Sequence, residues 1–265
     1  MIIDFHTHAF PDKIAHKTVD MLARKANIPW FCNGTVSDLR KSSLAAGIDK
    51  SVVLPIATKS GQETTINKFA AEINGTERII SFGSIHPKTE NYKEVLDTVK
   101  AYGLPGIKLH PDYQGFFVDD ESTYPMLEYA ARLGLVIVYH AGSDYGFRGE
   151  IKNTPVRAKK MLHAIGYDKF VMAHMGANAL YGDVLEVLCG ENVYFDTSFS
   201  LGRCDDSMVK AIISAHGDGK LLFGTDSPWD SQTADVRYLK NMDLPEGTKE
   251  KIFYKNAARL LGLEE

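Results

Sequence analysis

Cysteines are few in this sequence, and it contains no basic cluster and no long apolar run. Its three cysteines are odd in number and have no CxxC spacing, which argues against a disulfide framework or a thiolate metal site. The net charge of −4 and the absence of a Lys- or Arg-rich run predict no nucleic-acid partner. No apolar run approaches membrane-spanning length, and no signal peptide precedes the first apolar run. We therefore expect a cytoplasmic protein with reduced thiols, no membrane partner and a small-molecule substrate.

Short apolar runs alternate with longer stretches of helical periodicity. The runs lie at residues 2–5, 51–54, 79–84, 106–109, 135–139, 170–173, 193–195 and 220–223. The amphipathic stretches lie at residues 14–26, 64–74, 92–102, 124–133, 155–165, 181–188 and 207–216, with a closing helix at 255–263. Apolar runs of this kind indicate buried parallel strands joined by helices. Eight of them predict one domain over residues 1–265, an α/β protein with the (β/α)8 barrel or TIM-barrel fold.

The most informative motif is His6-Thr7-His8, which directly follows the first apolar run. In an extended segment, residues i and i+2 point to the same face. The two imidazoles are therefore expected to converge on one point, at a spacing that suits two ligands of one metal ion. An HxH motif can also be a pair of hydrogen-bonded residues at a strand edge, so its meaning depends on the residues at the ends of the other strands.

Polar groups that can bind metal or transfer protons follow most of the other runs. A parallel barrel has its active site at the C-terminal ends of its strands, so these groups are expected to meet. In chain order they are His86, Lys108, His110, His140, His174, Asp196 and Asp226. The other three histidines, His16, His163 and His216, fall in helical stretches.

Imidazole nitrogen and carboxylate oxygen are suitable ligands for a catalytic divalent metal. We predict that His6, His8, His140 and Asp226 surround one divalent metal ion. Such an ion lowers the pKa of a bound water molecule to about 7, and Asp226 is expected to accept the proton and pass it on. His174 is expected to polarise a substrate carbonyl or carboxylate, or to bind a second metal.

Other interpretations of these residues remain open at this stage. Asp226 precedes Ser-Pro and is a suitable helix N-cap. His140 can be a core histidine, and Lys108 can extend to solvent. His110 precedes a proline and can shape its loop. Asp196 is expected to orient a ligand or a loop rather than to bind the metal.

The order and strand positions of these residues resemble the amidohydrolase superfamily, and within it the amidohydrolase 2 branch. The resemblance runs from His6 to Leu263 and includes the Asn-Ala-Ala-Arg-Leu-Leu ending at residues 256–261. It implies a TIM barrel, a zinc-like ion and the ligand roles given above. In two-metal members of the superfamily, a lysine after the fourth strand is carboxylated and bridges the ions. Lys108 occupies that place, but we favour one ion, with Lys108 bound to an anionic substrate group or to a site carboxylate.

The resemblance implies an enzyme but leaves the reaction open. The first interpretation is a metal-dependent hydrolase that cleaves an amide, lactone or ester bond of a small carboxylated substrate. The alternative is a non-oxidative decarboxylase on the same barrel, which this chain's compactness makes less favoured. A barrel that only binds or assembles is disfavoured because the ligands are present. A TatD-type nuclease is disfavoured because Lys108 stands where a glutamate is expected.

The substrate side of the site is predicted from the loops that follow the strands. Tyr113, Arg148 and Trp229 are the candidate substrate-binding residues, and His110 joins Lys108 and His174 as a candidate for a second metal or for substrate. Aromatic walls with an arginine suit a small, carboxylated substrate. A homodimer is expected, because it is the commonest assembly of soluble oligomeric enzymes.

Overall fold

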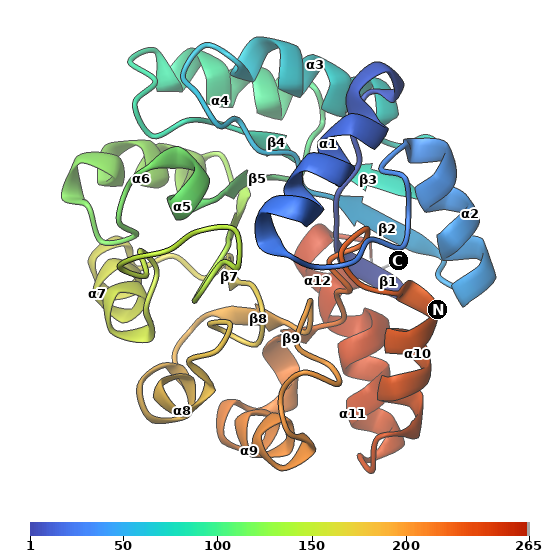
Figure 1. Cartoon of the computed structure of the whole chain (residues 1–265). Helices are drawn as coiled ribbons and strands as arrows, with labels where there is room; N and C mark the ends of the chain where they lie inside the picture. The colour runs from blue at the N-terminus through green and yellow to red at the C-terminus, as the bar shows by residue number, and fades with distance from the viewer. Residues whose placement is uncertain (264–265) are drawn as a thin grey trace.

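The apolar runs form parallel strands that follow one another around a barrel (Figure 1). The protein is described by a computed structural model that covers residues 1–263. The strands are β1 (Ile3–Thr7), β2 (Lys50–Val53), β3 (Ile79–Ser81), β4 (Gly83–Ser84), β5 (Gly106–Leu109), β6 (Val136–Tyr139), β7 (Phe170–Met172), β8 (Tyr194–Asp196) and β9 (Leu221–Leu222). Strands β3 and β4 are two parts of one expected run, so the predicted set of eight is confirmed.

The two ends of this series meet and close the barrel. Phe5 N donates to Phe223 O at 2.7 Å, Asp226 N donates to His6 O at 2.8 Å, and His8 N donates to Ser227 O at 2.6 Å. The first and last strands are therefore neighbours, and the (β/α)8 barrel predicted from the sequence is confirmed. Closure also places the residues after β9 beside the HxH motif, although more than 200 residues separate them in the chain.

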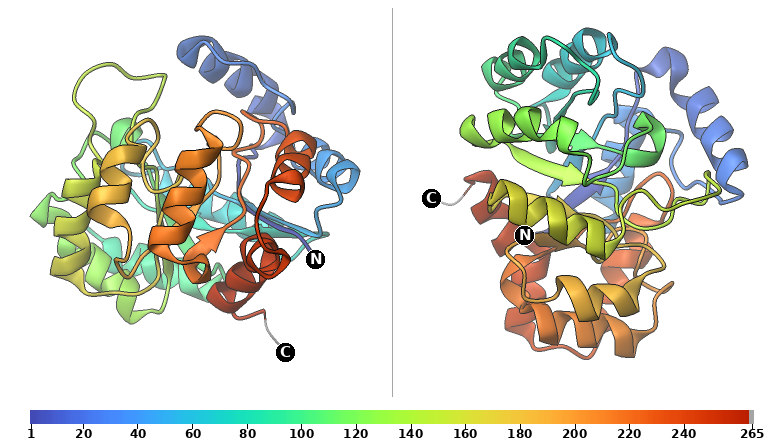
Figure 2. Two further views of the ribbon diagram at one scale, coloured as in Figure 1. Left: turned by 90° about the horizontal axis from the view of Figure 1, so that it is seen from below. Right: turned by 90° about the vertical axis from the view of Figure 1, so that its left-hand side faces the viewer.

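Helices surround the barrel on its outer side (Figures 1 and 2). Before β6 they are α1 (Asp12–Ala26), α2 (Val36–Ala46), α3 (Glu63–Ile73), α4 (Tyr92–Ala101), α5 (Pro111–Gln114), η1 (Glu121–Thr123) and α6 (Tyr124–Arg132). After it they are α7 (Pro155–Ile165), α8 (Tyr181–Asp183), η2 (Val184–Leu188), α9 (Asp206–His216), η3 (Asp218–Lys220), α10 (Gln232–Asn241), α11 (Glu246–Glu250), η4 (Lys251–Lys255) and α12 (Asn256–Leu261).

The structure contains two helices, α2 and α10, that the sequence pattern did not predict. Neither helix has the continuous apolar stripe that marks an amphipathic helix in a sequence. Their buried faces are rich in polar or small side chains, such as Ser43 on α2 and Gln232 on α10, rather than forming an apolar stripe. The two helices pack on each other across a polar layer that includes Asp4 of β1. There Gln232 donates to Asp4 Oδ2 at 2.8 Å, and Ser43 Oγ lies 3.2 Å from the Gln232 amide nitrogen.

The apolar core fills both the inside and the outside of the strand ring. Inside, Ile3, Phe5 and Val138 pack in one cluster with Ala257 and Leu260 of α12. Helix α12 therefore contributes to the barrel interior at the N-terminal ends of the strands. The sequence predicts a closing helix over 255–263, and α12 confirms it with slightly shorter bounds.

Helix α1 lies apart from the ring that the other helices form. Figures 1 and 2 show it over one end of the barrel, near the loops that follow the strands. Its buried face consists of the small residues Ala15, Val19 and Ala23. A Cβ added at Gly34 would lie 2.4 Å from Val19 Cγ2, so this glycine lets the following loop lie close against α1. This helix forms one wall of the cavity described below.

Asp235 is a buried acidic residue on α10, and it makes a testable contribution to stability. Burial, followed by the nearby charge of Asp230, raises its pKa to about 9 from 3.8. Between pH 4 and 9 the native state therefore binds more protons than the unfolded state, and stability falls as the pH rises. We expect Asp235→Asn to raise the free energy of unfolding at pH 8 by about 1–2 kcal/mol, with the difference shrinking toward pH 4. Urea denaturation of the variant and of the unmodified protein at pH 8 and pH 4 measures this difference. The same difference in free energy of unfolding at both pH values would contradict the prediction.

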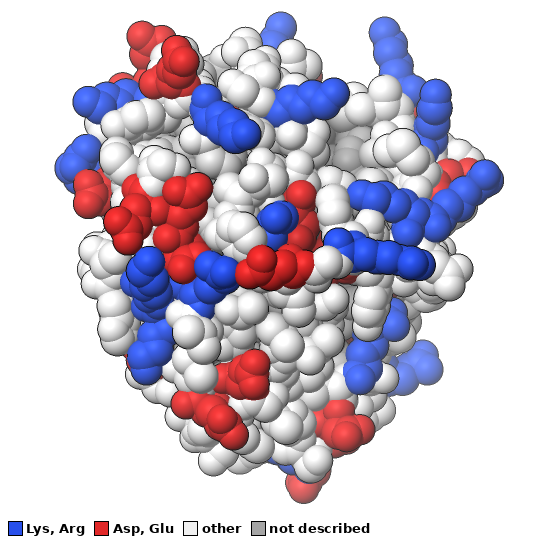
Figure 3. All heavy atoms as spheres, turned by 60° about the vertical axis from the view of Figure 1, so that its left-hand side comes forward, with Lys and Arg blue, Asp and Glu red and all other residues white. Residues whose placement is uncertain are grey.

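The surface gives no further architectural element. On the face drawn in Figure 3, acidic and basic side chains lie side by side rather than in separate patches of one sign. Among residues 1–263, no helix is both long enough and apolar enough to cross a membrane.

Candidate metal centre

The residues on either side of the barrel closure form a compact cluster of metal-binding groups. His6 Nε2 lies 3.3 Å and His8 Nε2 lies 3.2 Å from the same atom, Asp226 Oδ1. Each of the three residues offers one ligand atom within 4.8 Å of the other two. The geometry thus brings together three of the four ligands predicted from the sequence.

Local backbone geometry explains how these side chains reach one point. The register between β1 and β2 shifts between Asp4 and Thr7, so Phe5 packs in the barrel interior while His6 lines the cavity. Gly224 lies beneath His6, where a Cβ would lie 2.9 Å from His6 Cβ. Asp226 has a φ of +66°, a conformation that is uncommon for non-glycine residues and that aspartate adopts more readily than most.

The interpretation of Asp226 as a helix N-cap is wrong. Helix α10 begins six residues later at Gln232, and the side chain of Ser231 caps it by accepting from Ala234 N. Asp226 instead begins a tight turn, in which Trp229 N donates to Asp226 O at 2.8 Å. Its carboxylate is therefore not used at a helix terminus and faces the two histidines.

The second ring nitrogens of His6 and His8 show that the cluster fits a cation. His8 Nδ1 lies 3.0 Å from Leu54 O, and His6 Nδ1 lies 2.8 Å from Asp196 Oδ2. A carbonyl and a carboxylate only accept, so both Nδ1 atoms donate, and in a neutral ring Nε2 carries the lone pair. Both Nε2 atoms lie 3.2–3.3 Å from Asp226 Oδ1, where a proton on His8 Nε2 or a cation bound among the three atoms offsets the negative charge. The donor set therefore fits a divalent metal ion.

The charge states of the cluster also suit metal binding. Burial, followed by the nearby Lys108 charge, lowers the pKa of His6 to about 4, against the opposing effect of Asp196 and Asp226. Burial acts to raise the pKa of Asp226, but a hydrogen bond with His8 and the nearby imidazoles outweigh it and set it at about 2. At neutral pH, His6 is neutral and Asp226 is ionised, as metal ligands must be.

Lys108 lies within β5 and extends into the site rather than to solvent. Its side chain is 1% exposed, and Nζ lies 3.2 Å from His6 Nε2. Burial lowers its pKa to about 8, while the negative charges of Asp196 and Asp226 act in the opposite direction. Among residues 1–263, no carboxylate lies within ion-pair distance of this ammonium group. The interpretation that Lys108 reaches solvent is therefore wrong.

His140 and His174 form a hydrogen-bonded pair beside the cluster. His174 Nδ1 lies 3.0 Å from Ser198 O, and His174 Nε2 lies 2.9 Å from His140 Nδ1. The carbonyl fixes the proton on His174 Nδ1, so His140 Nδ1 donates and His140 Nε2 keeps a lone pair. That buried Nε2 has no hydrogen-bond partner among the residues described. His140 does not belong to the three-residue group at Asp226, so its predicted role as a fourth ligand stays a prediction.

Two further groups of possible ligands are geometrically less suitable. In the group of His6, His174 and Asp196, the imidazole Nδ1 atoms are already engaged by Asp196 and Ser198. In the group of His110, His140 and Asp144, the two imidazoles are stacked at 4.0 Å with an interplanar angle of 8°. In-plane lone pairs of parallel rings do not converge on one ion. His110 also accepts a long 3.5 Å bond from Tyr113 N at the start of α5.

The predicted substrate residues lie in different places. Tyr113 and Trp229 line a cavity of about 800 Å³ that opens onto the metal cluster. Arg148 is exposed and lies outside this lining, so the geometry removes the support for its predicted role. Sequence reasoning missed Asp144, which lines the cavity and lies 3.2 Å from His110 Nε2. Its position four residues after His140, beyond the same strand end, was a usable signal.

The histidines away from the cluster have structural roles. His86 makes contacts in its own loop, where Lys88 N donates to its Nδ1. His16, His163 and His216 lie in helices α1, α7 and α9, as expected. Asp196 holds His6 and the backbone N–H of His174, which fits its expected orienting part.

Comparison with known proteins shows the family of the chain. The family model Amidohydro_2, described as Amidohydrolase, matches residues 3–263. The chain therefore belongs to the amidohydrolase 2 family, as the resemblance in its sequence implied. No curated protein sequence matches the chain significantly.

Several solved structures share the fold over almost the whole chain. The 5-carboxyvanillate decarboxylase of Sphingomonas paucimobilis is 16% identical with a TM-score of 0.70, and the match covers 98% of each chain. A manganese-bound dihydroxybenzoic acid decarboxylase from Polaromonas is 15% identical with a TM-score of 0.73, covering 100% of this chain and 97% of that one. A candidate 2-pyrone-4,6-dicarboxylic acid hydrolase from Pseudomonas putida is 14% identical with a TM-score of 0.70, covering 100% and 98%. At these sequence identities the similarity shows a shared fold and does not by itself show a shared activity.

Proposed function

We propose that this protein is a metal-dependent, non-oxidative decarboxylase that replaces a carboxylate of a small acid with a proton. The observation that carries the proposal is the buried Lys108 ammonium, 3.2 Å from His6 Nε2 and without a carboxylate partner in residues 1–263. A metal ion on His6 and this ammonium would repel each other strongly in a buried site. An anionic group of the substrate between them removes that repulsion, and every substrate of a decarboxylase carries one.

Different residues of the site would bind the metal, orient the substrate carboxylate and transfer the proton. A divalent ion on His6, His8 and Asp226 would supply a Lewis acid that stabilises negative charge on substrate oxygen atoms. Lys108 orients the carboxylate, and the free lone pair of His140 Nε2 accepts a hydrogen bond from a substrate hydroxyl. Asp226 takes up one proton from solvent and transfers it to the carbon that bears the carboxylate, so that a C–H bond forms as the C–C bond breaks. Carbon dioxide leaves, and one proton takes its place.

The solved structures with this fold also favour decarboxylation over the hydrolysis preferred from the sequence. The proteins from Sphingomonas and Polaromonas are both decarboxylases of aromatic acids, and the second of these holds manganese. Imidazole and carboxylate ligands accept either manganese or zinc, so we propose one ion of either kind rather than zinc alone. The substrate is a small molecule, and no nucleic acid takes part.

Hydrolysis of a lactone, amide or ester remains the second candidate. The position of the ionised Asp226 carboxylate favours it, because a carboxylate beside the metal-binding nitrogens can accept a proton from water. The likeness to the candidate 2-pyrone-4,6-dicarboxylic acid hydrolase points in the same direction.

Isotope labelling separates the two reactions on one set of substrates. Protein loaded with Mn²⁺ or Zn²⁺ is incubated with hydroxybenzoates, 5-carboxyvanillate and 2-pyrone-4,6-dicarboxylate. For a decarboxylase we expect carbon dioxide, one deuterium in the organic product when the solvent is D₂O, and no ¹⁸O in that product from labelled water. Incorporation of ¹⁸O without carbon dioxide release would identify the hydrolase instead. The chelator-treated protein is the control, and it should be inactive in either case.

A further inference from the structure

The cavity above the metal cluster has two chemically different ends. All of its charged lining residues, Lys108, Asp144 and Asp226, lie with the histidines at one end. The other end is formed by α1, by the loop after β2 and by α3, and no described residue that lines it carries a charge. Its lining includes the apolar residues Ile14, Met21 and Leu22 of α1 and Ile56, Ile66 and Phe69, and among them lie the uncharged polar residues Thr18, Thr58, Gln62 and Thr65.

Helix α1 presents apolar side chains to this cavity, and no other residue within 1–263 covers them. Ile14 is 50% exposed and Met21 is 57% exposed, and both line the cavity, while α1 packs on the protein body through the small residues Ala15, Val19 and Ala23. Large exposed apolar side chains beside a binding site generally mark a surface that a ligand covers.

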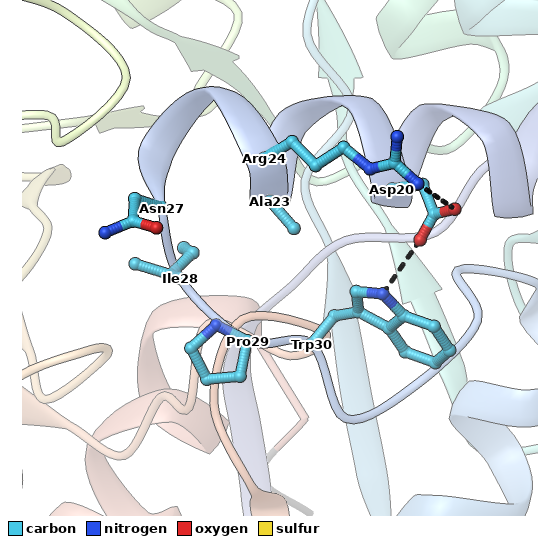
Figure 4. Close-up of a pocket in the computed structure, with 7 residues that line it drawn as sticks. All are labelled: Asp20, Ala23, Arg24, Asn27, Ile28, Pro29 and Trp30. Atoms are coloured by element: carbon cyan, nitrogen blue, oxygen red, sulfur yellow. Dashed lines mark hydrogen bonds and ion pairs between the residues drawn. The ribbon is translucent and has the colours of Figure 1, made fainter.

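The far end of α1 is tied to the loop that follows it. Figure 4 shows Asp20 between Arg24 and Trp30, in the shallow hollow at the end of the helix. Trp30 Nε1 donates to Asp20 Oδ1 at 3.0 Å, and Ile28 lines both this hollow and the main cavity. The apolar wall is therefore held in place without a ligand, which lowers the entropic cost of binding one.

The size of the cavity excludes a single aromatic ring as its full occupant. Its volume is about 800 Å³. An apolar cavity of about 150 Å³ already holds benzene, so one ring would leave most of the space unfilled. In the described part of the chain, no residue that lines the α1 end carries a charge that could pair with a phosphate, a sugar acid or another charged extension.

We infer that the substrate carries an extended, uncharged apolar arm that lies between α1 and α3 while its carboxylated head lies at the metal cluster. The arm is an alkyl chain or a second hydrophobic ring system. This inference rests on the proposed function for the identity of the head, but the arm itself is argued only from the shape and chemistry of the cavity. Met21 and Ile14 then determine specificity through contact with the arm.

Chain-length dependence of binding tests the arm directly. Hexanoate, octanoate and decanoate are titrated into the metal-loaded protein by calorimetry, below their micelle concentrations. We expect each added methylene to strengthen binding by about 3-fold. Met21→Gln should weaken decanoate binding by about 3- to 10-fold with a smaller effect on hexanoate, because the arm of hexanoate is too short to cover Met21 fully. Leu44→Gln is the matched control, since Leu44 is 64% exposed on α2 and does not line the cavity.

The outcomes distinguish the arm from the proposed reaction. Equal affinity for all three acids, or no effect of Met21→Gln, would overturn the inference even if carbon dioxide is released from monocyclic acids. Conversely, chain-length dependence in a protein that releases no carbon dioxide would contradict the proposed decarboxylase activity but would still support the apolar arm. Sedimentation of the free protein gives a further check. A dimer that Met21→Gln dissociates would show that a second copy covers α1, and would also overturn the inference.

Discussion

An Asp226→Asn variant is expected to lose at least about 1000-fold in kcat while it keeps its fold. Asp226 lies at the metal-binding nitrogens of both His6 and His8 and also lines the cavity, so the change removes a ligand charge and the proton carrier together. Asparagine has the same shape and tolerates the φ of +66° at this position. The loss is measured as kcat and as bound metal per chain.

Asp235→Asn is the matched control for this experiment. Asp235 is also a buried aspartate that follows β9, but it lies on α10 and does not line the cavity. We expect it to retain the kcat of the unmodified protein. A kcat of Asp226→Asn within 10-fold of that of the control would show that Asp226 has no essential part in the reaction.

The fold and the position of the metal cluster could be predicted from the sequence because both depend on where the buried strands lie and where each of them ends. The buried strands read as apolar runs, and the ends of parallel strands must share one rim of a barrel. Once the strands were placed, His6, His8 and Asp226 had to lie near one another, although they are far apart in the chain.

The features that the sequence did not reveal depend on side-chain direction or on contacts between distant elements. A lysine at the end of a strand looks the same whether it extends outward or inward, so the burial of Lys108 was not visible. Arg148 lies in a glycine-rich loop whose path no periodicity determines, and the loop turns this side chain to solvent. His140 follows its strand as predicted, but its Nδ1 is engaged by His174, a contact set by ring orientation alone.

The cavity wall shows a different limit of sequence reasoning. The amphipathic pattern of residues 14–26 predicted a helix, and the apolar stripe of a surface helix normally packs on the protein body. In the structure, α1 packs through alanines and a valine and turns Ile14 and Met21 to the cavity. One period of 3.6 residues cannot tell which apolar side chains meet the protein body and which are left for a ligand.

Replacing each histidine of the HxH motif should separate metal binding from folding. We expect His6→Ala and His8→Ala both to weaken metal binding by at least about 100-fold, because each removes one nitrogen ligand from the cluster. The metal-free proteins should differ in stability. His6 is 1% exposed and contacts Asp196, Ser198 and Lys108, so His6→Ala leaves buried polar and charged partners unsatisfied and should cost about 3 kcal/mol.

His8 has fewer protein contacts, and its removal should cost the metal-free protein about 1 kcal/mol or less. Its side chain is 11% exposed, and its Nδ1 bonds only to Leu54 O, which water in the cavity can satisfy once the ring is gone. Elemental analysis gives the metal content, and urea denaturation in the presence of a chelator gives the stability of the metal-free chains. Equal stability of the two metal-free variants would contradict the structural role of His6, and full metal occupancy in either would contradict the ligand assignment. If both expectations hold, His6 both binds the metal and stabilises the barrel core through its contact with Asp196, whereas His8 contributes to metal binding and little to stability.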